Sequence, residues 1–380
     1  MLGRNWTWAI LGVLALVARR IAMLHPEKTE TIYSRTFFPV VRNLTDLGIG
    51  RLPFPTVYLF VGLLVFLIGR FFVLVKRRSG WKERGMYSLR SILNFAGGLV
   101  FFFLIFWGFN YQRIPVFEQL SLKPRALEQE ILVQEMELTK RLLIQLRANI
   151  QADTVAISSF PVYKELESRV REEMGKNLYL LGLNFTGIPR TKEFHPHGFM
   201  RRMGIYGIYF PFTGESYIDP SLHPLEKPFT IAHEMAHSYG VTDEGEANFI
   251  GWLICSVSED PLLQYSGQLR LFRYHLNDLY RMDPDAYKTF VASIPIGIRN
   301  DMASVRENIL SVQPFFLELS KKSNDLYLKT QGVKAGVKSY AQLPMLAYAW
   351  RNRLRGNAEV ISDPFEGGQQ DGAGLDAGAR

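Results

Sequence analysis

The sequence predicts a mainly helical protein, in which N-terminal transmembrane helices precede a mostly helical α+β domain with a small β element before a His-Glu-x-x-His helix. Three observations lead to this prediction: long apolar runs near the N-terminus, helical periodicity after residue 113, and the segment TIAHEMAHSYGVTDEGEANFIGW. The expected organisation is a membrane region over 1–112 with spans near 6–24, 55–75 and 90–110, a soluble domain over 113–356, and a disordered tail over 357–380.

The apolar runs have the length and composition of membrane spans. Pro55–Val75 is long enough to cross the ~30 Å hydrocarbon core of a bilayer, and its one charge, Arg70, lies near the basic end. Ile92–Phe109 is a second such run, with Trp107 placed for the membrane interface. Trp6–Ala18 is shorter and lacks a well-formed signal-peptide cleavage site, so we expect an uncleaved first span.

The positive charge indicates topology rather than a nucleic-acid surface. The chain carries a formal net charge of +8, and much of it lies in one loop between two apolar runs, Lys76–Arg90. Such loops face the cytoplasm. We therefore expect a multi-pass protein of the cell membrane, with the segment near Ile21–Phe54 and everything after Asn110 on the extracytoplasmic side. The lipid bilayer is an expected partner, and nucleic acid is not.

Local patterns predict the elements of the soluble domain. Apolar residues at three- and four-residue spacing predict an amphipathic helix over Leu127–Ile150, and a second helix is expected over Val162–Met174. Aromatic and β-branched residues bounded by glycine and proline predict one or two strands in Gly204–Pro220, where YFPFTGES is a candidate substrate-binding edge. From Phe229 the pattern is helical almost to Arg355.

The His-Glu-x-x-His motif predicts a catalytic zinc site. His233 and His237 are four residues apart, which on a helix puts both imidazoles on one face, where they can share one Zn²⁺. Glu234 lies beside them as the candidate general base for a zinc-activated water. Gly240 is placed to end the helix. The single cysteine, Cys255, excludes a four-cysteine or Cys₂His₂ zinc site.

Three acidic residues compete for the third ligand position. Asp243 is a natural N-cap of the next helix, and Glu246 would be the N3 residue of its capping box. Glu244 has no such structural explanation and is the favoured ligand, with Glu246 and then Asp243 as alternatives. Glu244 also precedes Asn248 by one turn, the spacing at which a ligand and a supporting amide share a face.

These residues carry a resemblance. EGEANF (Glu244–Phe249) is similar to the Glu-x-x-Ala-Asp/Asn signature of gluzincin-type membrane proteases and ImmA/IrrE-like metallopeptidases. The resemblance implies that Glu244 binds zinc and that Asn248 supports a histidine. The chain also resembles an uncharacterised bacterial membrane-protein family, a domain of unknown function with N-terminal spans, which implies a zincin-like metallopeptidase domain. The stretches that carry it include WGFNYQR (107–113), YFPFTGES (209–216), PFTIAHEMAHSYG (228–240), QYSGQLR (264–270) and YLKTQGVKAGVKSY (327–340).

Together the patterns predict a membrane-anchored zinc metalloendopeptidase that acts on a peptide or protein substrate. One zinc ion would be held by His233, His237 and Glu244, with Glu234 as general base. The alternative is a non-catalytic metal-binding sensor or a module that binds a peptide or cell-wall ligand. An intramembrane protease is disfavoured because HEMAHSYGVTDEGEAN is too polar for a span. Tyr274 and His275 are weaker candidates for stabilising an oxyanion.

Overall fold

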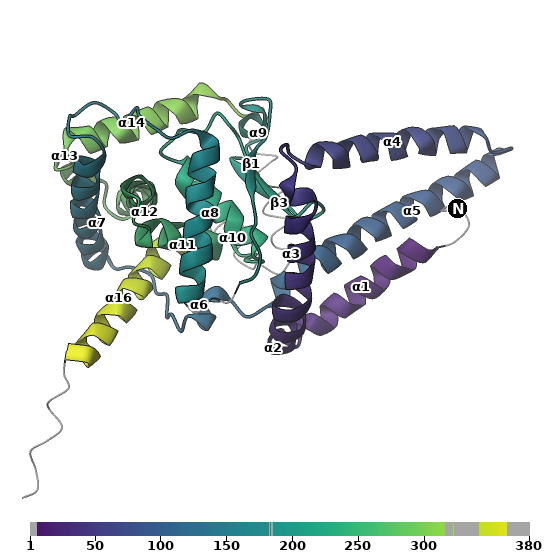
Figure 1. The fold of residues 1–380 in the computed structure, drawn as a ribbon, viewed down its shortest axis with the longest axis horizontal. Helices are drawn as coiled ribbons and strands as arrows, with labels where there is room; N and C mark the ends of the chain where they lie inside the picture. The colour runs from purple at the N-terminus through teal and green to yellow at the C-terminus, as the bar shows by residue number, and fades with distance from the viewer. Residues whose placement is uncertain (1–5, 182, 184, 316–321, 323–341, 363–380) are drawn as a thin grey trace, which may run out of the picture.

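A globular part and an arm of long helices make up the molecule (Figure 1). The computed structural model describes residues 6–181, 183, 185–315, 322 and 342–362, and the described chain is mainly helical. The arm consists of α1 (Thr7–Met23), α4 (Val57–Lys76) and α5 (Trp81–Phe106). Between α1 and α4 lie α2 (Pro26–Lys28), the π-helix η1 (Thr29–Phe37), α3 (Phe38–Leu47) and the 3₁₀ turn η2 (Ile49–Arg51).

The globular part begins after α5. Its first elements are η3 (Gly108–Gln112), α6 (Val116–Gln119), α7 (Gln129–Ile150), α8 (Tyr163–Leu180), β1 (Thr191–Glu193), α9 (Phe199–Arg202), β2 (Gly207–Phe210) and β3 (Glu215–Ile218). The helices that follow are α10 (Lys227–Ser238), α11 (Glu244–Val257), α12 (Pro261–Met282), α13 (Pro284–Ala292), α14 (Ile296–Ser311) and α16 (Leu343–Ser362).

Two helices of the described chain are long and apolar enough to cross a membrane, α4 and α5. None of the residues of α4 is buried, as expected for a helix that faces lipid. α1 reaches the required length only together with the helices at 26–51, from which it is bent by 114°. The structure thus has two candidate spans, or three if the bent pair counts as one.

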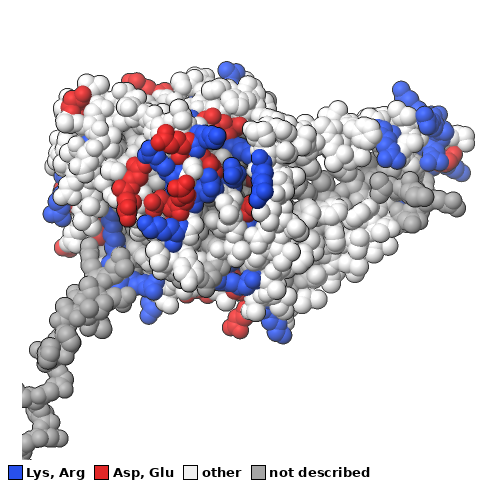
Figure 2. Space-filling view, viewed as in Figure 1, with Lys and Arg blue, Asp and Glu red and all other residues white. Residues whose placement is uncertain are grey.

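Basic side chains mark the far tip of the arm. The turn between α4 and α5 lies at the end away from the globular part, and α1 begins toward the same end (Figure 1). Lysine and arginine gather at this tip, and the sides of the arm are almost free of charge (Figure 2). The basic segment at 76–90 was expected to be a loop, but from Trp81 it forms the first turns of α5. This segment and the globular part lie at opposite ends of α4 and α5.

Glycine lets α1 and α5 cross closely. A Cβ atom at Gly97 would lie 2.3 Å from the Trp8 carbonyl oxygen, and one at Gly12 would lie 2.5 Å from the Gly97 Cα. The Asn94 side chain reinforces the crossing by accepting hydrogen bonds from the backbone amides of Trp8 (3.0 Å) and Ala9 (3.1 Å). Small residues at such a crossing are the usual basis of helix association in membranes.

The segment between the first two apolar runs forms η1 and α3 and packs against the globular part. Tyr33 and Phe38 are buried in an aromatic cluster with Trp107 and Tyr209. Its polar residues also bind inward: Arg113 donates two hydrogen bonds to the Glu30 carboxylate, at 2.8 and 2.9 Å. Long-range partners of this kind leave no periodic pattern in the sequence.

A three-stranded sheet lies against α10, with strand order β1-β3-β2. β2 is antiparallel to β3, with Gly207 opposite Ile218. β1 is parallel to β3 and was not expected from the sequence, because it is only three residues long. β2 and β3 fall within the predicted strand region Gly204–Pro220. Among the described residues β2 forms an edge of the sheet and pairs with β3 alone.

The helix predictions for the globular part are confirmed with changed limits. The helix expected at 127–150 is α7, and the one expected at 162–174 is α8, which continues to Leu180. The region expected to be helical from Phe229 is divided into separate helices, of which α12 and α16 pack against α11. The structure does not describe residues 316–321 and 323–341, which include the YLKTQGVKAGVKSY stretch. It also does not describe the part of the predicted tail that follows Ser362, the last residue of α16.

Replacing Gly97 by valine should destabilise the arm, because the added methyl groups meet the Trp8 backbone. Overpacking of this kind costs about 1–3 kcal/mol, so the thermal unfolding midpoint in detergent should fall. The matched control is Gly62→Val on α4, where a Cβ meets nothing within 4 Å. Equal midpoints for the two variants would contradict the close α1–α5 crossing.

Candidate metal centre

α10 presents two histidines from a rigid, enclosed position. Pro228 lies in its first turn, and nearly every residue from Pro228 to Ser238 is buried. The rings of His233 and His237 lie on one face, with centroids 4.8 Å apart. Gly240 ends the helix with a φ of +86°, in the left-handed region that glycine adopts without strain, as the sequence predicted.

A short turn returns the chain to the histidines. The Val241 amide bonds to the Ala236 carbonyl (3.1 Å), and the Val241 carbonyl oxygen lies 2.7 Å from His237 Nδ1. Asp243 then caps α11 by accepting hydrogen bonds from the amides of Gly245 (2.8 Å) and Glu246 (3.0 Å). Because the cap makes Glu244 the first residue of α11, the Glu244 side chain points from the first turn of α11 toward the two histidines.

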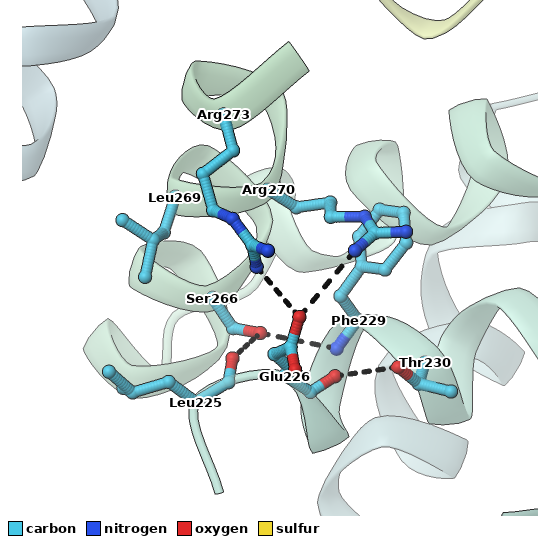
Figure 3. A pocket seen from close by; sticks show the side chains of 8 residues that line it. All are labelled: Leu225, Glu226, Phe229, Thr230, Ser266, Leu269, Arg270 and Arg273. Atoms are coloured by element: carbon cyan, nitrogen blue, oxygen red, sulfur yellow. Dashed lines mark hydrogen bonds and ion pairs between the residues drawn. The ribbon is translucent and has the colours of Figure 1, made fainter. Parts of the chain in front are cut away.

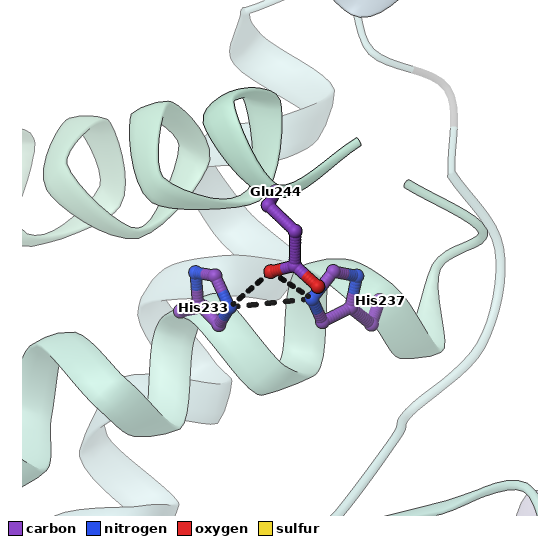
Figure 4. Close-up of side chains that lie close together, drawn as sticks. All are labelled: His233, His237 and Glu244. Carbon is purple, nitrogen blue, oxygen red and sulfur yellow. Dashed lines mark hydrogen bonds and ion pairs between the residues drawn. The ribbon is translucent and has the colours of Figure 1, made fainter. Parts of the chain in front are cut away.

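The structure brings His233, His237 and Glu244 together (Figure 4). Glu244 Oε2 lies 3.3 Å from the Nε2 atom of each histidine, and the two Nε2 atoms are 3.2 Å apart. Ligand atoms bound at 2.0–2.1 Å to a tetrahedral zinc ion are about 3.3 Å from one another. The three groups therefore fit a metal ion, and the His237 Nδ1 bond to the chain leaves Nε2 directed into the group.

The pKa values in the group reflect one shared carboxylate. Burial alone would lower the pKa of His237, but the charge of Glu244 and its hydrogen bond raise it to about 9. Burial outweighs the same carboxylate at His233, so its pKa is lowered. At Glu244 the opposing effect of burial is overcome by His237 and His233, which hold the pKa well below its usual range. The group of His233, His237 and Glu244 therefore favours a bound positive charge.

Glu234 lies beside the group and outside it. Burial, together with the charge of Glu244, raises the pKa of its carboxyl to about 8 against the opposing effect of His237. Gly207 of β2 gives the side chain its space, since a Cβ atom there would lie 2.3 Å from Glu234 Oε1. Glu234 Oε2 is buried and has no hydrogen-bond partner among the described residues. Such an oxygen is available to a group that enters the site.

The other two acidic candidates point elsewhere. Asp243 is occupied by the cap of α11. Glu246 accepts a hydrogen bond from the Phe117 amide at 3.1 Å, and burial raises the pKa of its carboxyl to about 8. It joins α11 to α6 rather than to the histidines. Of the three alternatives left open by the sequence, Glu244 is the one that faces His233 and His237.

The weaker candidates have other surroundings. The Asn248 amide donates to the Tyr274 hydroxyl at 3.4 Å. His275 is buried, and burial lowers its pKa to about 3. No hydrogen-bond partner of its ring nitrogens is found in the described part of the chain.

Sequence reasoning missed the contacts that join the site to the arm. Trp107, directly after α5, donates from Nε1 to the His237 carbonyl oxygen at 2.8 Å. Asn110 packs under the turn, where a Cβ atom on Gly240 would lie 2.9 Å from its side-chain amide carbon. The sequence predicted Trp107 at the membrane interface, whereas the structure buries it against the site. The stretch with Asn110 was noted without a role. The one signal for Gly207 was a glycine inside a strand, which often marks a close approach.

The chain matches one known protein family over most of its length. Residues 33–348 match the family described as Protein of unknown function (DUF3810). The chain belongs to this family. The match begins in η1 and includes α4, α5 and the whole candidate metal centre, whereas α1 lies before it. No curated protein and no solved structure gave a significant match.

Glu244→Gln should weaken metal binding strongly in this DUF3810 protein, because it removes one of three ligands. Even residues that only orient ligands cost about 10–100-fold in affinity, so a loss above about 100-fold is expected in chelator competition. The matched control, Glu246→Gln, should keep its zinc. The reverse pattern would make Glu246 the ligand.

Zinc binding should release protons near neutral pH. With a pKa of about 9, His237 is protonated in the metal-free protein, and a ligand must be deprotonated. We expect about one proton per zinc at about pH 7.5, and affinity that rises with pH toward the pKa of His237. Calorimetry in buffers of different ionisation enthalpy measures the proton release. Glu234 also titrates near this pH, so the Glu234→Gln variant isolates the proton released by His237. Zero release would contradict the His237–Glu244 pairing.

Proposed function

We propose that this protein is a membrane-anchored zinc metalloendopeptidase. The observation that carries the proposal is the convergence of His233, His237 and Glu244 at 3.2–3.3 Å, with the Glu234 carboxyl beside them. Among the described residues the group offers three ligands. Three protein ligands are typical of catalytic zinc, whereas structural sites are closed by a fourth.

The side chains divide the chemistry among them. Zinc at this site would lower the pKa of a water molecule and polarise a substrate carbonyl. Glu234 accepts the proton of the attacking water and passes it to the leaving amine. A carboxyl with a pKa of about 8 in the metal-free site exchanges protons near neutral pH, as such a group must. Glu244 and the imidazoles hold the metal, and the His237 bond to Val241 fixes the ring.

The arrangement around the centre supports a zincin-like α+β domain. α10 packs against the sheet, and the strand next to Glu234 is the edge strand β2. A peptide that pairs with the outer edge of β2 would pass the Glu234 carboxyl. Main-chain hydrogen bonds would then position the scissile bond whatever side chains the peptide carries.

The arm supports a multi-pass protein of the cell membrane with the candidate site outside. The basic tip favours the cytoplasmic side, and the globular part is at the opposite end of α4 and α5 (Figures 1 and 2). His237 is bonded to the residue that directly follows α5. The site would therefore act on a peptide or protein substrate close to the extracytoplasmic face of the cell membrane. α10 itself is outside the candidate spans, which argues against an intramembrane protease.

One observation favours the second candidate, a non-catalytic metal-binding sensor or peptide- or cell-wall-binding module. His233, Glu234 and His237 are only 8%, 4% and 7% exposed, so a substrate needs an opening movement to reach them. A metal site that stays closed would bind without hydrolysing. The two candidates differ in what Glu234 does.

Glu234→Gln should abolish peptide hydrolysis and keep the zinc. Loss of a general base costs about 10²–10⁴-fold in rate, to be measured with a quenched fluorescent peptide library on the full-length protein in liposomes. Glu118→Gln, a carboxyl outside the metal group, is the control and should keep the wild-type rate. If the zinc-loaded wild type and Glu234→Gln are equally inactive, the binding module is the better account.

A further inference from the structure

Two arginine side chains lie next to the candidate metal centre, in a hollow between the start of α10 and the middle of α12 (Figure 3). Arg270 and Arg273 both reach toward one oxygen of Glu226. Arg273 makes the close contact, at 2.7 Å, and Arg270 remains at 3.6 Å. Two guanidinium groups share one carboxylate, so the hollow keeps an excess of one positive charge.

The Arg270 guanidinium is held in place by aromatic rings rather than by a full ion pair. Its central carbon lies 5.2 Å from the centre of the Phe229 ring and 5.3 Å from that of Tyr274. Its Nε is buried and has no hydrogen-bond partner in the described chain, yet the side chain is 34% exposed. A partly exposed guanidinium fixed on aromatic faces is suited to a bidentate carboxylate.

This group is near enough to the metal centre to act on the same substrate. Phe229, on which Arg270 rests, stacks on His233 with ring centroids 6.3 Å apart. Arg270 also interacts electrostatically with His233 and with Tyr206, the residue before Gly207 of β2. An extended peptide advances about 3.3 Å per residue, so Arg270 is within about three residues of a bond held at His233.

We propose that Arg270 forms a subsite for a carboxylate of the substrate, either an acidic side chain near the scissile bond or the C-terminal carboxylate of a peptide. The inference rests on the proposed function, because it assigns the substrate preference of the same site. Glu226 orients Arg270 without neutralising it, and Arg273 holds Glu226. Arg270 is a specificity-determining residue, and removing it leaves the metal ligands in place.

The test uses zinc-directed hydroxamate probes on the zinc-loaded full-length protein in detergent. One pair of probes differs only in a glutamate or glutamine side chain, and a second pair only in a C-terminal carboxylate or amide. In the wild type, the carboxylate member of one pair should bind at least about tenfold more tightly than its neutral partner. The pair that shows the preference identifies the source of the carboxylate.

The variants separate recognition from a purely structural ion pair. Arg270→Gln should reduce the preference to about one, and Arg270→Lys should restore part of it. Arg281→Gln, which changes an exposed arginine near the end of the same helix, is the control and should keep the preference.

The outcomes are distinct. Equal binding of both members of each pair by the wild type, or a preference that survives Arg270→Gln, overturns the carboxylate subsite and leaves the metallopeptidase proposal standing. Hydroxamates that fail to bind the zinc-loaded protein, or a protein that retains no zinc, overturn the proposed function and the subsite with it.

Discussion

The turn between α10 and α11 is the constraint on which the candidate site depends. Five residues, Tyr239–Thr242 and the cap Asp243, must reverse the chain so that Glu244 meets two histidines of the preceding helix. Gly240 supplies the positive φ, Val241 holds the His237 ring, and Asp243 fixes the start of α11. A longer turn would leave the angle between the helices free, and the three ligand atoms would lose their common centre.

The membrane arm supports this turn from outside. Trp107 donates to the His237 carbonyl, and Arg113 bonds to the Gly240 carbonyl oxygen at 3.4 Å while pairing with Glu30. Residues from before α4 and after α5 thus meet at the same turn. The geometry of the metal centre is therefore linked to the packing of the arm. The candidate site lies at the end of the globular part that joins the arm.

Much of the local structure could be predicted because it depends on short-range patterns. The helical face of His233 and His237, the Gly240 stop and the Asp243 cap each follow from residues within one or two turns. The favoured position of Glu244 rested on the same reasoning, since the cap explained Asp243. The prediction for Glu246 was incomplete, because its bond to Phe117 joins residues 129 positions apart.

Features that depend on distant contacts could not be predicted. The segment before α4 has no clear periodicity, and its helices are defined by partners such as Arg113 and Trp107. The short strand β1 exists through its pairing with β3. Arg270 lies in QYSGQLR, a stretch noted in the sequence without a role. Its aromatic supports come from α10 and α12, and only the folded chain brings them together.

The central claim is that His233, His237 and Glu244 hold one zinc ion with an open position, and X-ray absorption at the zinc edge of the loaded full-length protein tests it most directly. The account predicts two imidazole nitrogens and one or two oxygens at about 2.0–2.2 Å, with one imidazole lost in His237→Ala. A sulfur ligand, a shell of oxygens without imidazole, or a spectrum unchanged in His237→Ala would contradict it.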